Sequence, residues 1–415
     1  GTTITAADFT VTNGGTPTIT GSGSSRTITV VASGQGAVTI APAAGFSVSD
    51  VAGNAATTAG GADRSVTFDS VAPTLTLAQA AGQSDPTKVS SIQFTLTSNE
   101  ALDASTLTAS DFTITNGSSP TITGSGSSWT VTTTATADGA VTIAPSGTFS
   151  VSDIAGNTQG TAGGSDRSVA YDTTAPTLTL EQAAGQSDPA NSSSIAFTLS
   201  ANEALDGSTI TASDFTVTGG GTPTITGSGA TYTITTTASG DGAVTIAPAV
   251  GFLVRDVAGN AQTSAGGSDR AVTYDATAPT LTLVQAAGQA DPAKNASIQF
   301  TLTSNEPLDG TSVSASDFTV TNGSATSVSG SGTTFTVTTT AVADGPVIIA
   351  LASGFSVADT AGNTSTTAGG ADRTVTYDAT APSVSLQQAT GQIDPTRVAS
   401  VQFSLTADEP LRSEE

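Results

Sequence analysis

The sequence repeats itself every 103 residues, and this period limits the possible folds more than any other feature. The string Asp-x-Ala-Gly-Asn begins at Asp50, Asp153, Asp256 and Asp359, with no insertion or deletion between the copies. Repeats that stack as solenoids are much shorter, at roughly 20–45 residues. Each copy is therefore expected to be a domain with its own hydrophobic core.

Within one copy, apolar residues alternate with Thr, Ser or Gln, which is the pattern of half-buried strands. Turn residues such as Gly, Asn, Asp and Pro separate the alternating segments. In the second copy the expected strands lie at residues 75–77, 92–96, 112–114, 122, 129–131, 141–143 and 169–171. Short strands in this number, without helical periodicity, predict an all-β fold of tandem seven-stranded Ig-like sandwiches.

The period also sets the expected domain boundaries. The first copy begins after the position of its second strand, and the last copy contains only the first two strands. We expect the sandwiches to be arranged as a rod. The predicted parts are an incomplete Ig-like domain at 1–71 that lacks its first two strands, Ig-like domains at 72–174, 175–277 and 278–380, and a two-strand C-terminal segment at 381–415.

Several strings of the second and third copies resemble a known family. They are YDTTAPTLTL, FTLTSNEAL, DFTITNG, ADGAVTIAP and SDIAGN. These strings are similar to the bacterial Ig-like repeats of large surface adhesins and biofilm-associated proteins, and the resemblance covers essentially the whole chain. It implies secreted, extracellular stalk modules at a bacterial cell surface, of the kind that calcium rigidifies at domain junctions.

Composition argues against several other functions. The chain has 34 acidic and 10 basic residues, and its net charge of −24 leaves no basic patch for nucleic acid. It contains no Cys and no His, which removes the usual thiol nucleophile and the commonest general base. No apolar run has the length of a membrane span. We therefore expect no enzymatic activity, no nucleic-acid partner and no membrane insertion.

Acidic residues are expected to gather where the repeats join. If the strands alternate up and down, the end of the second strand, the Asp-x-Ala-Gly-Asn loop and the preceding linker meet at one end of each domain. Clustered carboxylates repel one another, and Ca²⁺ accepts six to eight oxygen ligands. The predicted calcium ligands are Asp69, Glu100 and Asp153, then Asp172, Glu203 and Asp256, then Asp275, Glu306 and Asp359.

A local role for these acids remains the alternative. An Asp in a loop often accepts hydrogen bonds from nearby backbone N–H groups and only stabilises a turn. This turn or capping role is what we expect of the other periodic acids, Asp85, Asp103 and Asp111.

The two ends of the chain together contain one complete repeat, which predicts self-association. Strands from the C-terminal segment of one molecule would complete the N-terminal sandwich of the next, giving a head-to-tail homopolymer. The apolar side chains expected to be donated are Val384, Leu386, Val401, Phe403 and Leu405. The same junction would form a calcium site from Asp378 and Glu409 of one subunit and Asp50 of the next.

The leading hypothesis is thus a subunit of an extracellular filament, with calcium at its domain junctions. One alternative is a stalk fragment of a large bacterial adhesin that does not polymerise. Another is an adhesin whose domains bind glycan or protein directly, with stacking on Trp129, Tyr232 and Phe335, although aromatic residues at this position more often pack at the rim of a core. The sequence identifies no surface ligand.

Overall fold

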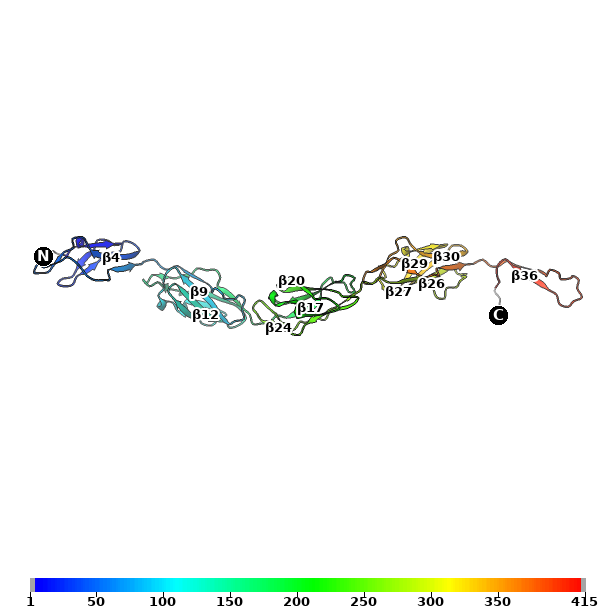
Figure 1. The fold of residues 1–415 in the computed structure, drawn as a ribbon, viewed down its shortest axis with the longest axis horizontal. Helices are drawn as coiled ribbons and strands as arrows, with labels where there is room; N and C mark the ends of the chain where they lie inside the picture. The colour runs from blue at the N-terminus through cyan, green and yellow to red at the C-terminus, as the bar shows by residue number, and fades with distance from the viewer. Residues whose placement is uncertain (1–3, 412–415) are drawn as a thin grey trace. The chain divides into compact units, whose positions relative to one another are not determined.

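A computed structural model describes residues 4–411 of the chain (Figure 1). Across these residues the regular structure consists of β-strands and single 3₁₀ turns of three residues, so the prediction of an all-β fold is confirmed. In this part of the chain, no helix has the length and apolar character needed to cross a membrane. The chain divides into two compact units: Gly1–Pro176, Glu203–Asp206 and Val254–Gln262 form the first, and Thr177–Asn202, Gly207–Leu253 and Thr263–Glu415 form the second.

The first unit contains a complete sandwich, which we call the second module (residues 75–171). One sheet has the order β11–β12–β9–β8 and the other has the order β10–β13–β16. A short additional pair consists of β14 and β15. The strands are β8 (Leu75–Gln79), β9 (Ser91–Ser98), β10 (Phe112–Thr115), β11 (Thr121–Ser125), β12 (Ser128–Thr134), β13 (Gly139–Pro145), β14 (Val151–Ser152), β15 (Thr158–Gln159) and β16 (Ser168–Tyr171).

The core of the second module follows from the alternation in its strands. Ile92, Phe94 and Leu96 of β9 are fully buried, whereas Gln93 between them is exposed. They pack in one cluster with Val141 and Val169 of the opposite sheet. The predicted Ig-like sandwich is therefore confirmed as a two-layer arrangement around one apolar core.

The remaining part of the first unit includes what we call the N-terminal module (residues 4–71). It has a three-stranded sheet β1–β4–β7 and two separate pairs, β2–β3 and β5–β6. Within residues 4–71, no strand takes the places that β8 and β9 have in the second module. The strands are β1 (Phe9–Thr12), β2 (Thr18–Thr20), β3 (Thr27–Thr29), β4 (Gly36–Pro42), β5 (Val48–Ser49), β6 (Ala55–Ala56) and β7 (Ser65–Phe68), and the unit also holds the pair β23 (Val254–Arg255) and β24 (Ala261–Gln262).

The second unit repeats the same pairing twice. Its first two sheets have the orders β17–β18–β21–β20 and β19–β22–β25. The strands are β17 (Leu178–Gln182), β18 (Ser194–Ala201), β19 (Phe215–Thr218), β20 (Thr224–Ser228), β21 (Thr231–Thr237), β22 (Gly242–Pro248) and β25 (Ala271–Tyr274).

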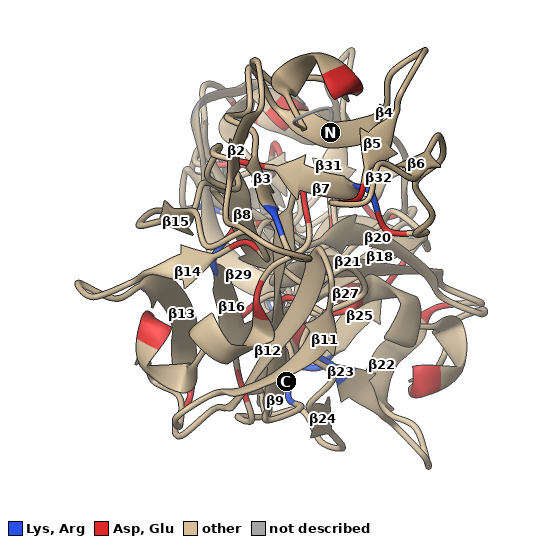
Figure 2. Ribbon diagram, turned by 90° about the vertical axis from the view of Figure 1, so that its left-hand side faces the viewer, with Lys and Arg blue, Asp and Glu red and all other residues tan. Residues whose placement is uncertain are grey.

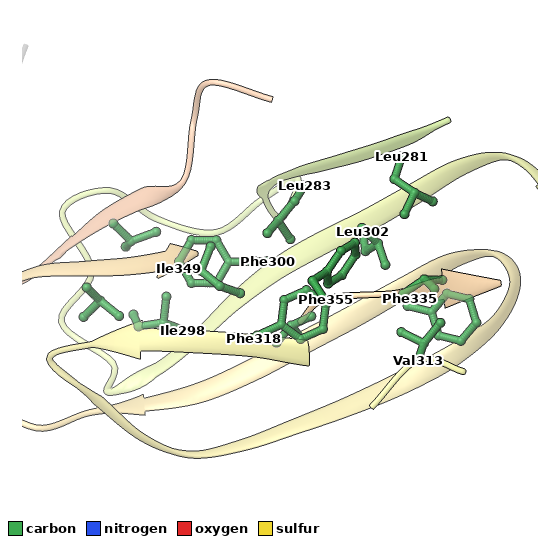
Figure 3. Packing of buried hydrophobic residues seen from close by; sticks show 14 of the residues in the cluster. Leu281, Leu283, Ile298, Phe300, Leu302, Val313, Phe318, Phe335, Ile349 and Phe355 are labelled. Atoms are coloured by element: carbon green, nitrogen blue, oxygen red, sulfur yellow. The ribbon is translucent and has the colours of Figure 1, made fainter. Parts of the chain in front are cut away.

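The next sandwich of this unit has the sheets β29–β27–β26–β33 and β28–β30–β34, with the pair β31–β32. Figure 3 shows Phe300, Leu302, Phe318 and Phe355 pointing toward one another inside this sandwich, and all four belong to one buried cluster. The strands are β26 (Leu281–Gln285), β27 (Ser297–Leu308), β28 (Phe318–Thr321), β29 (Gly323–Ala341), β30 (Gly345–Leu351), β31 (Val357–Ala358), β32 (Thr364–Ser365), β33 (Ala368–Gly369) and β34 (Thr374–Tyr377).

The second unit also contains a hairpin of β35 (Val384–Gln388) and β36 (Phe403–Ala407), which we call the C-terminal hairpin. Its two strands form a two-stranded sheet with no third strand among the described residues. The strands thus follow the predicted pattern, while the domain boundaries and the arrangement as a rod stay predictions.

Candidate metal centres

The Asp-x-Ala-Gly-Asn string forms the tight loop between β14 and β15. Asp153 accepts hydrogen bonds from the backbone N–H of Asn157 at 2.9 Å and from its side-chain Nδ2 at 2.8 Å. Gly156 in this loop has a φ of 92°, a conformation that favours glycine. Asp256 and Asn260 form the same pair of bonds, as do Asp359 and Asn363. The loop therefore fixes the first carboxylate of each centre, and the local capping role that the sequence left open is present.

The second carboxylate lies near the end of the second strand of each module, two residues beyond it for Glu100 and Glu203 and inside β27 for Glu306. Glu100 lies two residues beyond β9, and its backbone N–H donates to Ser98 Oγ at 3.3 Å. The neighbouring Asn99 accepts a 2.6 Å bond from the backbone N–H of Thr74, just before β8. This bond holds the end of β9 against the start of β8, and a bridge between Leu102 and Asp153 brings the segment after β9 to the β14–β15 loop.

The third carboxylate comes from the segment that precedes the first strand. Asn157 Nδ2 donates to the backbone carbonyl of Asp69 at 3.2 Å, in addition to its bond with Asp153. Asn260 donates to the carbonyl of Asp172 at 2.9 Å, and Asn363 donates to that of Asp275 at 2.8 Å. The asparagine of each loop therefore connects the loop to the linker, a role that sequence reasoning missed. The recurrence of this asparagine in every copy of the string was the sequence signal for this role.

These contacts bring all three predicted triplets together. In each triplet, one carboxylate oxygen from every residue lies within 4.8 Å of the others. Asp153 and Asp256 are 2% exposed and Asp359 is 1% exposed, while the other members are half-buried. The triplets are Asp69, Glu100 and Asp153; Asp172, Glu203 and Asp256; and Asp275, Glu306 and Asp359.

Mutual repulsion is visible in the pKa values of the three glutamates. Burial raises the pKa of Glu100, Glu203 and Glu306, and the neighbouring aspartates raise each of them further. Burial also acts to raise the pKa of Asp153, but the hydrogen bonds from Asn157 and the loop backbone outweigh it and lower that pKa overall. Each centre therefore combines an aspartate held in its loop with a glutamate whose charge is disfavoured.

The chemistry of these centres fits a hard cation. Their ligand atoms are oxygens only, and the chain has no His or Cys to add nitrogen or sulfur ligands. Glu306 Oε1 is buried and has no hydrogen-bond partner in the structure, which is unusual for a buried carboxylate oxygen. The chain has 34 acidic and 10 basic residues, which Figure 2 colours red and blue on the ribbon. These groups could hold a metal ion.

The residues predicted to form a fourth centre are placed differently. Asp50 accepts the same two bonds from Asn54, at 2.8 and 2.9 Å, but no triplet among the described residues includes it. Burial raises the pKa of Glu409, and the charges of Asp378 and Asp408 raise it further. Asp378 and Glu409 also belong to no triplet among the described residues.

The remaining sequence candidates have structural roles. Asp103 and Asp111 cap short 3₁₀ turns, as predicted. Asp85 does more than stabilise a turn, because it accepts a 2.9 Å bond from the backbone N–H of Ala170 in β16. The proposed sugar-stacking residues are buried: Trp129, Tyr232 and Phe335 are only 7%, 6% and 2% exposed.

Comparisons with known proteins find similarity only among solved structures. No protein-family model and no curated protein matches the chain. The Escherichia coli adhesin FdeC matches over 74% of this chain and 96% of its own, with 14% identity and a TM-score of 0.34. Invasin, a bacterial integrin-binding protein, matches over 81% of this chain and 68% of its own, with 14% identity and a TM-score of 0.35.

InvD of Yersinia pseudotuberculosis matches over 70% of this chain and 89% of its own, with 16% identity and a TM-score of 0.28. Bacterial adhesins are thus among the solved structures that are similar to this chain.

Proposed function

We propose that this chain is an extracellular structural protein of the bacterial cell surface, built from tandem Ig-like sandwiches. Calcium at the three acid triplets stiffens the linkers between the sandwiches. The chain is a subunit of a filament that grows head to tail through donated strands, and it performs no catalysis.

The observation that carries the calcium part is the threefold recurrence of one ligand set. Each triplet joins a linker aspartate, a glutamate at the end of the second strand and a loop aspartate within 4.8 Å. The unpartnered Glu306 Oε1 supports a cation as the missing partner. Calcium is favoured over Mg²⁺ because it accepts more oxygens in a less regular geometry. Asp69, Asp172 and Asp275 lie in linkers, so a bound ion restrains each linker against its sandwich.

Calorimetric titration of the full chain with CaCl₂ and with MgCl₂ tests this part directly. We expect calcium to bind with a dissociation constant of about 10⁻⁴ to 10⁻³ M, as in other extracellular modules. Melting curves in millimolar calcium should lie above those in EDTA, because a ligand that binds only the native state stabilises it.

A matched pair of variants isolates the sites from the overall charge. The variant Glu100→Gln, Glu203→Gln, Glu306→Gln should lose the calcium-dependent gain in melting temperature. The control Asp166→Asn, Asp269→Asn, Asp372→Asn removes the same charge from exposed, equally periodic positions and should retain the gain. If the two variants respond alike, or if calcium changes nothing in the unaltered chain, the acids are only turn and linker residues.

The filament part is supported by the apolar side chains that the N-terminal module and the C-terminal hairpin leave exposed. Phe403 in the hairpin is 67% exposed, whereas its repeat equivalent Phe94 is fully buried. Burying the five predicted donor side chains contributes up to roughly 10 kcal/mol before ordering costs. That free energy is sufficient for tight association.

Sedimentation velocity and negative-stain electron microscopy of the purified chain in calcium test assembly. We expect linear polymers, because a head-to-tail interface is heterologous. Deletion of residues 381–415 should abolish them, and Phe403→Asp should weaken them severely, since it places a charge in the completed core. A chain that remains monomeric at high concentration would instead support the reading of a stalk that does not polymerise.

A further inference from the structure

We propose that the apolar groove of the N-terminal module binds the C-terminal hairpin of a second copy of this chain in one defined register. In this register β36 lies antiparallel to β3, with Ile28 opposite Phe403. The inference rests on the proposed head-to-tail assembly and specifies the interface through which it occurs.

The groove is the open side of the N-terminal module. Its volume is about 670 Å³, and residues of β3, β4 and β7 line it, so both layers of the module contribute to it. Its larger apolar lining residues are Ile28, Val30, Val38, Ile40, Val66 and Phe68. Val66 is 73% exposed here, whereas the equivalent Val169 of the second module is fully buried under β8 and β9. The groove is thus a sandwich core without its cover.

The C-terminal hairpin exposes apolar side chains at the repeat positions that cover the core in the second module. Its apolar side chains are between 56% and 68% exposed, while their equivalents in the second module are between 0% and 3% exposed. The hairpin side chains are Val384, Leu386, Val401, Phe403 and Leu405, and their equivalents are Leu75, Leu77, Ile92, Phe94 and Leu96. An isolated two-stranded hairpin is only marginally stable in water. An exposed apolar face of this extent indicates a binding surface.

The two strands of the C-terminal hairpin already pair in the register that β8 and β9 have in the second module. Leu386 lies opposite Leu405 in β35–β36, just as Leu77 lies opposite Leu96 in β8–β9. Binding therefore requires no rearrangement within the hairpin, and both of its strands can enter together.

Internal modules define the register of the new contact. Val131 lies opposite Phe94 in the second module, Ile234 lies opposite Phe197, and Val337 lies opposite Phe300. The residues at the same repeat position in the N-terminal module and the hairpin are Ile28 and Phe403. A slip of one residue would turn every donated apolar side chain to the outer face, so the register is strongly specified.

Both partners present a free strand edge at this contact. Within the described residues, β3 pairs only with β2 and β36 pairs only with β35. The other edge of each strand has unpaired backbone N–H and C=O groups, which are the groups that strand addition satisfies. A second copy is the occupant because its hairpin supplies apolar side chains at the same repeat positions as those that close the internal modules, with Val384 and Val401 in place of Leu75 and Ile92.

A disulfide test of the register is possible because the chain contains no cysteine. The matched variant is Thr29→Cys with Gln402→Cys, which repeats the position of the internal pair Thr132 and Gln93. The control is Thr29→Cys with Ser404→Cys, which moves the second cysteine two residues along the same face. Directly opposite Cβ atoms lie about 4.5–5.5 Å apart and diagonal ones about 7–8 Å, so only the matched pair approaches disulfide geometry.

The full chains are oxidised in calcium and separated on a non-reducing gel, with circular dichroism and sedimentation velocity recorded on the same samples. We expect a ladder of covalent multimers from the matched variant, at least tenfold more abundant than from the control. A mixture of the single variants Thr29→Cys and Gln402→Cys should yield a cross-linked dimer in an amount that neither variant yields alone, and this dimer joins two different copies.

Each other outcome has a distinct meaning. Equal ladders from the matched and control variants, with assembly still present in sedimentation, would overturn the register and leave the filament proposal standing. A cross-linked product that stays at the mass of one chain would overturn the second copy as the occupant. Loss of assembly in the unaltered chain would overturn the filament proposal itself, and this inference with it.

Discussion

The N-terminal module has the strands of the second module except for equivalents of β8 and β9, and it exposes apolar side chains that the second module buries. In both, the three-stranded sheet has one register: Val11 lies opposite Ile40 in β1–β4, and Ile114 lies opposite Ile143 in β10–β13. The ring pair Phe9–Phe46 has its centroids 5.8 Å apart, and Phe112–Phe149 has them 6.0 Å apart. Yet Val66 is 73% exposed and Val169 is fully buried. Strand pairing in this fold is therefore determined locally, whereas burial depends on the first two strands of the repeat.

The largest expected effect comes from replacing Val66 and Val169, which occupy the same repeat position, with aspartate. Val169→Asp buries an unpaired carboxylate and should destabilise the second module by more than about 4 kcal/mol. Val66→Asp places the same group in solvent and should change the stability of the monomer by less than about 0.5 kcal/mol. Differential scanning calorimetry at low protein concentration measures both values. Equal losses would mean that the two cores are closed to the same extent.

Calcium binding provides the second contrast between the modules. Asp153→Ala removes a member of a triplet and should lower the calcium stoichiometry of the monomer by one site. Asp50→Ala removes the equivalent loop acid, which has no triplet around it among the described residues, and should leave the stoichiometry unchanged. At calcium concentrations near 100 times the dissociation constant, each lost site corresponds to about 2.7 kcal/mol of stabilisation. If both variants lower the stoichiometry equally, the N-terminal module binds calcium by itself, without a second subunit.

The pH dependence of stability should separate the modules in metal-free conditions. The pKa values of Glu100, Glu203 and Glu306 are raised above the ordinary 4.5, so between that pH and the raised values the native protein holds protons that the unfolded chain has lost. Stability should therefore rise as the pH falls from neutral through this window. Below the ordinary aspartate value of 3.8, stability should fall again, because Asp153 has a lowered pKa and contributes stability only when it is ionised.

Melting curves in EDTA at several pH values test this dependence. Residues 1–71 contain no glutamate, so the transition of the N-terminal module should lack the rise. The variant Glu100→Gln, Glu203→Gln, Glu306→Gln should flatten the curve of the other modules. A rise that persists in this variant would assign the effect to groups outside the triplets.

The smallest expected effect concerns the turn that precedes the first strand common to both modules. Asp111 accepts bonds from the backbone N–H and the hydroxyl of Thr108 at 2.7 and 2.8 Å, and Asp8 accepts the same bonds from Thr5 at 2.7 and 3.0 Å. Asp111 is only 6% exposed, whereas Asp8 is half-buried. We expect Asp111→Ala to cost about 1–2 kcal/mol and Asp8→Ala about 0.5–1 kcal/mol in unfolding experiments. A larger loss at Asp8 would show that burial does not strengthen this cap.

Much of the fold could be predicted because its information is local. The alternation of Ile92, Phe94 and Leu96 with polar residues determines which face of β9 is buried, and the 103-residue period transfers that prediction to every copy. The convergence of the acid triplets also followed from strand direction alone. An even number of strand reversals returns the chain to the same end of a sandwich.

Other features depended on contacts that no periodicity encodes. Asn157 reaches the carbonyl of Asp69 across 88 residues, and Asp85 reaches the backbone of Ala170 across 85 residues. The pair β14–β15 has only two residues in each strand, too few for a recognisable alternation. Such contacts are determined by the distance between loops in the folded chain, which a pattern of residue types does not specify.

The identical registers of the sandwiches have a consequence for refolding. In the pairs β8–β9, β17–β18 and β26–β27, the second strand pairs with its neighbouring strand in the same register in every copy. Each strand pair could therefore also bind to the corresponding strand of any other copy. A strand pair tethered to its own copy has an effective concentration of about millimolar, which outcompetes pairs from other molecules in dilute solution. At high concentration after complete denaturation, exchange between copies becomes competitive, and misassembly is a characteristic failure of repeat proteins. This chain should therefore reach its native pairing most faithfully when its copies emerge and close one after another, as they do during synthesis.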